Sequence, residues 1–229
     1  MNNKFTNLDD ITGNRLKYGT ILADPPWRFS NRSGKMAPEH KRLARYPTMS
    51  LEEIRNLPIS ELALPKSHLY LWVPNALLAE GLTVMESWGF QYKTNLVWHK
   101  IRKDGGPDGR GVGFYFRNVT ELILFGIKGP LRTKKPGRSQ VNIILSRKRE
   151  HSRKPDELYN IIEDCSPGPY LELFARHKRT NWHQWGNEIE SGPKSALKDN
   201  KKNEIKIEII TYDKLLKLKG AKQKLASIL

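Results

Sequence analysis

Short apolar runs alternate with amphipathic stretches along most of the chain. Residues 20–23 form an apolar run typical of a buried strand, and residues 76–88 carry apolar side chains at the spacing of a helix. The same pattern predicts further strands at residues 68–73, 91–98, 120–127, 141–145 and 170–174. Strands and helices therefore alternate, which indicates an α/β fold class.

Capping residues mark where two helices begin. Ser50 and Glu53 form a capping box, which opens one helix. Pro155, followed by two acidic residues, opens another helix that continues through Asp164. Strands interleaved with helices predict a mostly parallel sheet covered on both faces, and ligands bind such sheets beyond the carboxyl ends of the strands. Asp24, directly after the first strand, is therefore a candidate functional residue.

The chain is predicted to consist of one domain over residues 1–190 and a basic extension over residues 191–229. Ser191-Gly192-Pro193 is typical of a linker. Beyond it, residues 204–210 alternate like a strand, and residues 213–229 fit a basic amphipathic helix. The pattern leaves open whether this extension packs on the core, contacts nucleic acid or mediates dimerisation.

The net charge of +16 is concentrated in four stretches of the chain. Residues 128–154 carry ten basic residues and one acidic residue. Basic residues also outnumber acidic ones by six to one in residues 28–45, five to two in residues 100–117 and ten to four in residues 191–229. Such stretches match the footprint of a polyanion, because each Lys or Arg at a phosphate releases a counterion. The charge favours nucleic acid as a partner, and a solvated surface is the alternative.

Composition argues against several other classes. No apolar run approaches the roughly 20 residues of a membrane span, and the polar first ten residues lack the apolar core of a signal peptide. The single cysteine, Cys165, excludes an intramolecular disulfide and a cysteine-based zinc site. We therefore expect a cytoplasmic protein with no membrane contact and no metal ion.

Asp24, Pro25, Pro26 and Trp27 form the motif that carries the predicted chemistry. An exocyclic amine of a base is a poor nucleophile, because its lone pair is delocalised into the ring. The Asp24 carboxylate and the Pro25 carbonyl supply two acceptors that would favour a pyramidal nitrogen. The prolines fix the backbone and remove competing N–H donors, and Trp27 offers a flat face for a base that has left the stack. The alternative is a proline-rich turn with a core tryptophan.

This motif resembles the catalytic motif of amino-methyltransferases, for which adenine and cytosine are both open. From about Gly19 to Glu188 the chain further resembles the family named for the seventy-kilodalton subunit of the messenger-RNA adenine methyltransferase, as a short microbial or phage member. The segments that carry this resemblance are residues 71–73, 96–100, 126–129, 151–157, 171–176, 181–182 and 186–188. The resemblance implies adenine N6 methylation and a Rossmann-like methyltransferase sheet. Its order would be permuted, with the catalytic motif before the cofactor-binding strand.

The resemblance also implies S-adenosylmethionine as cofactor and roles for individual residues. The residues implied to bind the cofactor are Asp24, Lys154, Glu172, Phe174, Arg176, His177 and Asn187. Lys154 would approach the methionine carboxylate, with Asp24 near the amino group. The residues implied to lie beside the target base are Tyr46, Trp98, Glu121, Ser152 and Arg153. Trp98 and Phe174 have an alternative as core residues.

The chain departs from the family pattern in two places. His177-Lys178-Arg179 stands where a proline followed by His-Asn is expected, and this affects the predicted ribose contacts. Glu188 stands where the family often has a glutamine. The acidic residue expected to contact the cofactor's adenine would fall near residues 6–10, with Asn7, Asp9 and Asp10 as candidates.

We expect DNA rather than RNA as the substrate, because the chain is short and lacks the separate RNA-binding domain that messenger-RNA methyltransferases usually carry. RNA is the first alternative, and a catalytically silent nucleic-acid-binding partner subunit is the second. A homodimer or a partner subunit is left open. Methylation of a small molecule would leave the basic stretches unexplained.

Overall fold

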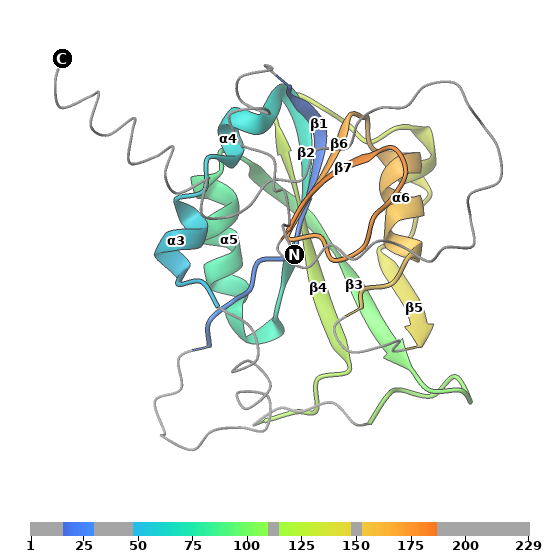
Figure 1. Ribbon diagram of the computed structural model, residues 1–229. Coiled ribbons are helices and arrows are strands. Elements are labelled where there is room, and N and C mark those ends of the chain that lie inside the picture. Colours follow the sequence, from blue (N-terminus) through green and yellow to red (C-terminus); the bar gives the residue numbers. More distant parts are fainter. Residues whose placement is uncertain (1–15, 30–47, 110–114, 148–152, 187–229) are drawn as a thin grey trace, which may run out of the picture.

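Seven strands form a single sheet in the computed structural model, which describes residues 16–29, 48–109, 115–147 and 153–186 (Figure 1). The strands are β1 (Tyr18–Ala23), β2 (Ala63–Val73), β3 (Gln91–Ile101), β4 (Thr120–Lys128), β5 (Ile143–Arg147), β6 (Tyr170–Leu173) and β7 (Trp182–Trp185). The helices are α3 (Leu51–Arg55), α4 (Ile59–Leu62), α5 (Leu78–Ser87) and α6 (Glu157–Cys165), with 3₁₀ turns η1 (Asn75–Leu77) and η2 (Lys135–Arg138).

The sheet has the strand order β5-β3-β4-β2-β1-β6-β7. β4 is antiparallel to both of its neighbours, β2 and β3, and the other pairings are parallel. The other six strands therefore point the same way, and their carboxyl ends meet at one edge. β4 brings its first residues to this edge. The mostly parallel sheet is confirmed, and β1, the strand that leads into the Asp24 motif, comes earlier in the chain than its neighbour β6.

Helices cover both faces of the sheet, as predicted. On β2, Leu69 and Leu71 pack in one apolar cluster with residues of α3, α4 and α5. Tyr70 and Trp72, which alternate with them, pack in a second cluster with residues of α6. Figure 1 shows α3 and α5 on one side of the sheet and α6 on the other. The period-two alternation of a strand thus gives each face its own core.

Element boundaries differ from the predictions where the backbone is irregular. The helix expected over residues 76–88 begins as the 3₁₀ turn η1 after Pro74 and becomes α5 at Leu78. The strand expected over residues 170–174 is β6, which ends at Leu173 because Phe174 has a φ of 64°. β7 was not predicted, since its four residues are too few to show a period.

Ser191-Gly192-Pro193 and the elements predicted beyond it lie outside the described residues. The division at residue 190 therefore stays a prediction. Within the described ranges, no helix combines the length and the apolar character that crossing a membrane would require.

Candidate active site

Asp24 lies at the middle of the carboxyl edge of the sheet. It follows β1 directly, and its backbone N–H donates to the Leu173 carbonyl of β6 at 3.4 Å. Its carboxylate forms an ion pair with Lys154, whose Nζ lies 3.3 Å from Oδ2. Lys154 comes from the segment that precedes α6, so three parts of the chain meet at this carboxylate. The predicted proximity of Asp24 and Lys154 is present in the structure.

Asp24 is the end of an alternating chain of four charged groups. The Lys154 ammonium donates to Glu121 Oε2 at 2.9 Å, and the other oxygen of Glu121 accepts from Lys100. Glu121 is the second residue of β4, and Lys100 is the last but one of β3. Each interior member of the chain therefore has two partners of opposite charge, which is what partly buried charges require.

These neighbours set the protonation of the site. Burial raises the pKa of Glu121, but Lys154 and Lys100 outweigh burial and lower it to about 2. Burial also raises the pKa of Asp24, and here the attraction of Lys154 and Arg176 only partly compensates, so that the pKa stays above its ordinary value. Burial lowers the pKa of Lys154, whereas Asp24 and Glu121 raise it, and the rise prevails.

The rings of two tryptophans pack against the two lysines of this chain of charges. Nζ of Lys154 lies 4.5 Å from the centre of the Trp72 ring, and Nζ of Lys100 lies 4.9 Å from that of Trp98. The two rings meet edge to face, 6.0 Å apart. Trp98 is 3% exposed and its indole N–H donates to Ser146. In the structure, Trp98 is a core residue that supports Lys100 and offers little surface to a base.

The motif itself is a tight turn whose donors and acceptors are partly engaged. The backbone N–H of Trp27 donates to the Pro25 carbonyl at 2.8 Å, as in a γ-turn. The prolines therefore do not leave this carbonyl without a competing donor, which corrects the expectation. A carbonyl oxygen has two lone pairs, so one remains for a ligand.

Trp27 packs differently from the prediction. The side chain is 6% exposed and belongs to the core cluster with Met49. Its indole N–H donates to the Trp72 carbonyl at 2.9 Å. Trp27 thus fixes the turn to β2, and the open flat face expected for a base is not present in the described residues. The alternative, a core tryptophan, describes this side chain better.

The carboxylate of Glu172, on β6, connects this strand to α6 and to β7. One carboxylate oxygen accepts from the Tyr159 hydroxyl at 2.6 Å and the other from the Gln184 side-chain amide at 2.8 Å. Burial raises the pKa of Glu172 despite these two hydrogen bonds. The Gln184 amide also donates to the His177 carbonyl, so Gln184 links β7 to β6 and to the segment after it. The contact of Glu172 with a cofactor stays a prediction.

The chain turns sharply after β6 and approaches the end of β7. Phe174 has a left-handed backbone, and its ring packs edge-on against Trp185 at 5.0 Å. The Ala175 N–H donates to the Trp185 carbonyl. A Cβ on Gly186 would lie 2.1 Å from the Ala175 carbonyl oxygen, so glycine is required there. This turn directs Arg176 toward Asp24, where its charge acts on the Asp24 pKa.

Asp156 joins two arginines on one side of the site. Arg153 donates to one of its oxygens at 3.2 Å and Arg179 to the other at 3.1 Å. The Arg179 guanidinium also lies 3.8 Å from the centre of the Tyr159 ring. Arg179 belongs to the segment that departs from the family pattern, and its contacts give that segment a role in holding Arg153.

Several predicted residues cannot be placed. Tyr46, Ser152 and Asn187 lie outside the described residues, as do residues 6–10. Four residues of the site were not predicted from the sequence: Lys100, Tyr159, Gln184 and Arg179. No local pattern marks them, because each acts through a partner on another element. The register that pairs Trp98 with Glu121, for example, is what places Lys100 beside that carboxylate.

Comparison with known proteins identifies the family. The model of the MT-A70 family matches residues 18–188. The chain belongs to the MT-A70 family. The MT-A70 match covers the sheet, the charged chain and the turn after β6.

Individual MT-A70 relatives differ in length. The chain is 28% identical over 226 residues to the type II methyltransferase M.MunI of Mycoplasma sp., covering 87% of this chain and 93% of that protein. It is 34% identical over 186 residues to a putative N(6)-adenosine-methyltransferase MT-A70-like protein of Medicago truncatula, and 30% identical over 178 residues to the human N(6)-adenosine-methyltransferase catalytic subunit METTL3. The matches cover 79% and 76% of this chain but only 27% and 28% of those proteins.

The family and the fold together confirm two predictions. The sheet is that of an α/β methyltransferase with the catalytic motif before the cofactor-binding strand. The predicted assignment to methyltransferases that act on the N6 amino group of adenine is confirmed at the level of the family.

Proposed function

We propose that this MT-A70 protein transfers a methyl group from S-adenosylmethionine to the N6 amino group of adenine in DNA. The observation that carries the proposal is the Asp24 carboxylate, held at the carboxyl edge by Lys154 and backed by Glu121 and Lys100. DNA is preferred because the relative matched over nearly its whole length is a type II methyltransferase, whereas the relatives named for adenosine match over about a quarter of theirs.

The groups around Asp24 fit the amino-acid end of this cofactor. The Asp24 carboxylate is suited to bind an ammonium group. The cations of Lys154 and Arg176 are suited to bind a carboxylate. Lys154 has three N–H donors, of which Asp24 and Glu121 take two, so a third remains for a ligand carboxylate. Phe174, Arg176 and Asn187 would border the adenosine part, with Glu172 and His177 nearby. When bound, the cofactor supplies the methyl carbon.

The residues of the motif orient the target amine. Oδ1 of Asp24 accepts no hydrogen bond from another described residue, and the Pro25 carbonyl keeps a lone pair; together they can accept both N–H groups of the amine. This arrangement would hold the nitrogen lone pair toward the methyl carbon, which is the main task of such an enzyme. The nitrogen gains the methyl group and loses one proton to solvent as or after transfer, so no strong base is needed.

The ionised form of Asp24 is required for this role. Its pKa is raised, so it would lose the charge at a higher pH than an ordinary aspartate, and the Lys154 ammonium opposes that loss. Tyr46, Glu121, Ser152 and Arg153 are proposed to surround the base. An adenine that is paired within a duplex cannot reach Asp24, so the target adenine must leave the base stack.

Labelled cofactor with mixed nucleic acids tests the proposal. The purified chain is incubated with S-adenosylmethionine carrying a labelled methyl group and with matched double-stranded DNA, single-stranded DNA and RNA, and the modified base is identified by mass spectrometry. We expect N6-methyladenine in DNA and no transfer by Asp24→Asn. Label on cytosine, or no label on any nucleic acid, would refute the assignment, and label on RNA alone would refute DNA as the substrate.

A further inference from the structure

A cavity of about 680 Å³ lies at the opposite end of the sheet from Asp24. It opens between the first half of β3, the end of β4 and the segment around η2. Its volume falls in the range of about 300–1,000 Å³ that is usual for small-molecule sites. The chemistry around Asp24 does not use this cavity.

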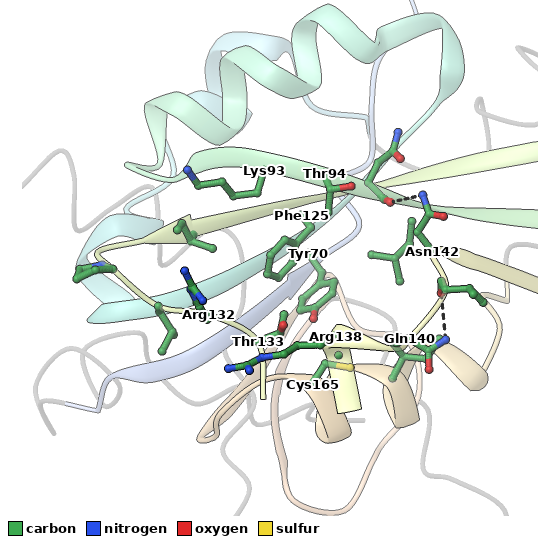
Figure 2. Close-up of a pocket in the computed structure, with 18 residues that line it drawn as sticks. Tyr70, Lys93, Thr94, Phe125, Arg132, Thr133, Arg138, Gln140, Asn142 and Cys165 are labelled. Atoms are coloured by element: carbon green, nitrogen blue, oxygen red, sulfur yellow. Dashed lines mark hydrogen bonds between the residues drawn. The ribbon is translucent and has the colours of Figure 1, made fainter. Parts of the chain in front are cut away.

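The cavity combines an apolar floor with a positive rim. Figure 2 shows Tyr70 and Phe125 side by side in the middle of the lining, with Lys93, Arg132 and Arg138 around them. The two floor rings are 2% and 7% exposed and their centres lie 5.0 Å apart. None of the described residues that line the cavity is acidic. Its occupant should therefore have an apolar body and a negative charge.

The three rim cations are not engaged with carboxylates. Among the described residues, no ion pair or hydrogen bond joins the side chains of Lys93, Arg132 or Arg138 to an acid. This differs from the active site, where every cation of the charged chain has an acidic partner. A cation without a partner keeps its full attraction for a ligand anion.

The rim favours a phosphate over a simple carboxylate. Two of its three cations are arginines, whose planar guanidinium groups match phosphate oxygens in pairs. Thr94 and Gln140 add uncharged donors and acceptors to the walls, which suit the edge of a heteroaromatic base. A flat base with a phosphate attached is a nucleotide.

The surrounding surface favours a nucleotide within a strand. Residues 128–147, which form much of the wall, carry six basic residues and no acidic one. Thr94 faces the cavity and Lys100 faces the active site six residues further along β3, which is about 20 Å of strand at about 3.3 Å per residue. Stacked nucleotides rise about 3.4 Å each, so about six of them span that distance.

We propose that this cavity binds one unpaired nucleotide of the nucleic acid, several positions away from the methylated adenine. The inference rests on the proposed function for the identity of the ligand. It goes beyond that function, because a site so far from Asp24 would affect how strands are held and leave methyl transfer itself unchanged.

The first experiment measures binding of an adenine-free strand. Fluorescence anisotropy of a labelled oligothymidylate of about ten nucleotides, within the usual site sizes for single strands, gives the dissociation constant. Arg132→Ala with Arg138→Ala removes two rim charges. Lys17→Ala with Lys66→Ala removes two exposed charges that neither line the cavity nor belong to residues 128–147. We expect the rim pair to weaken binding at least about tenfold and the control pair less than about threefold. Equal losses would mean that only net charge matters, which would overturn the proposal.

A second variant fills the cavity without changing the charge. Thr94→Trp places a large ring from β3 into the space, and Thr94→Ser is its matched control. We expect Thr94→Trp to weaken oligothymidylate binding at least about fivefold with an unchanged salt dependence, because it blocks the base and leaves the phosphate contacts. Gln140→Glu, which adds a carboxylate at the wall, should weaken binding as well. If Thr94→Trp and Gln140→Glu both bind like the wild type, the proposal is overturned. If one of the two does not fold, wild-type binding by the other is enough to overturn it.

Competitors identify the ligand. Unlabelled oligothymidylate should displace the labelled strand, whereas thymidine monophosphate should do so only at much higher concentration. If thymidine monophosphate competes as tightly as the oligothymidylate, the ligand is a free nucleotide and the proposal of a strand is overturned. If only the fatty acid laurate displaces the labelled strand, the proposal of a nucleotide ligand is overturned.

Methylation of a short substrate separates the two proposals. A target adenine with two flanking nucleotides on each side is too short to reach the cavity, so every cavity variant should methylate it at the wild-type rate. If the wild type methylates it and the cavity variants bind oligothymidylate normally, only this inference fails. If nothing is methylated but the rim and filling variants still lose binding, the proposed function fails and the cavity site stands.

Discussion

The two ends of the sheet use positive charge in opposite ways. At the carboxyl edge, Lys100 and Lys154 alternate with Glu121 and Asp24 over two tryptophans. At the other end, the cations around the cavity face an apolar floor and no acid among the residues described. The first arrangement is internally neutralised and therefore fixed in position. The second has an excess of positive charge and therefore selects a ligand.

This difference shows what a count of basic residues leaves out. Lys100 and Lys154 at one end, and Arg132 and Arg138 at the other, come from basic stretches of the sequence, and by composition these stretches look like polyanion footprints. The acids that neutralise Lys100 and Lys154 lie directly after β1 and on β4, in other parts of the chain. A Lys with two carboxylate partners orients other groups, whereas an Arg without a partner attracts anions at long range. Variants that change one charge at each end should therefore behave differently.

The largest effect is expected when a negative charge is removed at the active site, in comparison with a negative charge added at the cavity. Asp24→Asn should lower kcat/KM by about 10²–10³-fold, because a preorganised charged acceptor is lost and Lys154 keeps only one partner. Gln140→Glu makes the opposite change at the cavity and should leave kcat on the short substrate within about twofold. Steady-state kinetics with both variants checks this, and a large loss in Gln140→Glu would break the comparison between the two ends.

A smaller effect is expected from removing one Lys at each end. Lys154→Met should raise the KM for the cofactor by about 10–100-fold, since one charged hydrogen bond is lost, while Lys93→Met should leave it unchanged. Lys154 lowers the pKa of Asp24, and a carboxylate with a raised pKa loses its charge sooner as the pH falls. The acid limb of the pH–rate profile should therefore move to higher pH in Lys154→Met only.

A test of stability concerns Glu121. Its pKa is lowered to about 2 in the folded protein, so its stabilising contribution is present above the ordinary pKa of a glutamate and is lost as the pH falls toward 2. Glu121→Gln should lower the free energy of unfolding by about 1–3 kcal/mol at neutral pH, and by less at pH 3. Urea titrations at both pH values measure this, with the exposed Glu86→Gln on α5 as control. An equal loss at both pH values would mean that Glu121 acts through packing rather than charge.

A change in stability of similar size is expected at the turn beside the active site. Gly186→Ala places a Cβ against the Ala175 carbonyl and should destabilise the fold by about 1–3 kcal/mol. Gly109→Ala meets no atom within 4 Å and should change stability by less than about 0.5 kcal/mol. Thermal unfolding of both variants distinguishes the close contact at Gly186 from a general cost of replacing glycine. Similar melting temperatures for the two variants would contradict the importance of that contact.

The sequence was sufficient where a function depends on neighbours in the chain. The strand before Asp24, the capping box at Ser50 and the proline that precedes α6 are local signals, and the structure has each of them where expected. The motif and the segment that contains Lys154 identified the family for the same reason. Trp27 shows the limit even here, because whether a tryptophan faces a ligand or the core depends on what packs against it.

The tertiary structure alone decided which charges meet. The antiparallel course of β4 brings Glu121 to the carboxyl edge, and its register with β3 places it beside Lys100. Folding also places Lys93, Arg132 and Arg138 around one apolar floor, although Lys93 and Arg132 are 39 positions apart in the chain. The sequence by itself thus determined the chemistry that is available and the strand that presents it. Strand pairing decided which of the basic residues are neutralised and which stay free to bind, because attraction between charges depends on distance in space and not on separation in the chain.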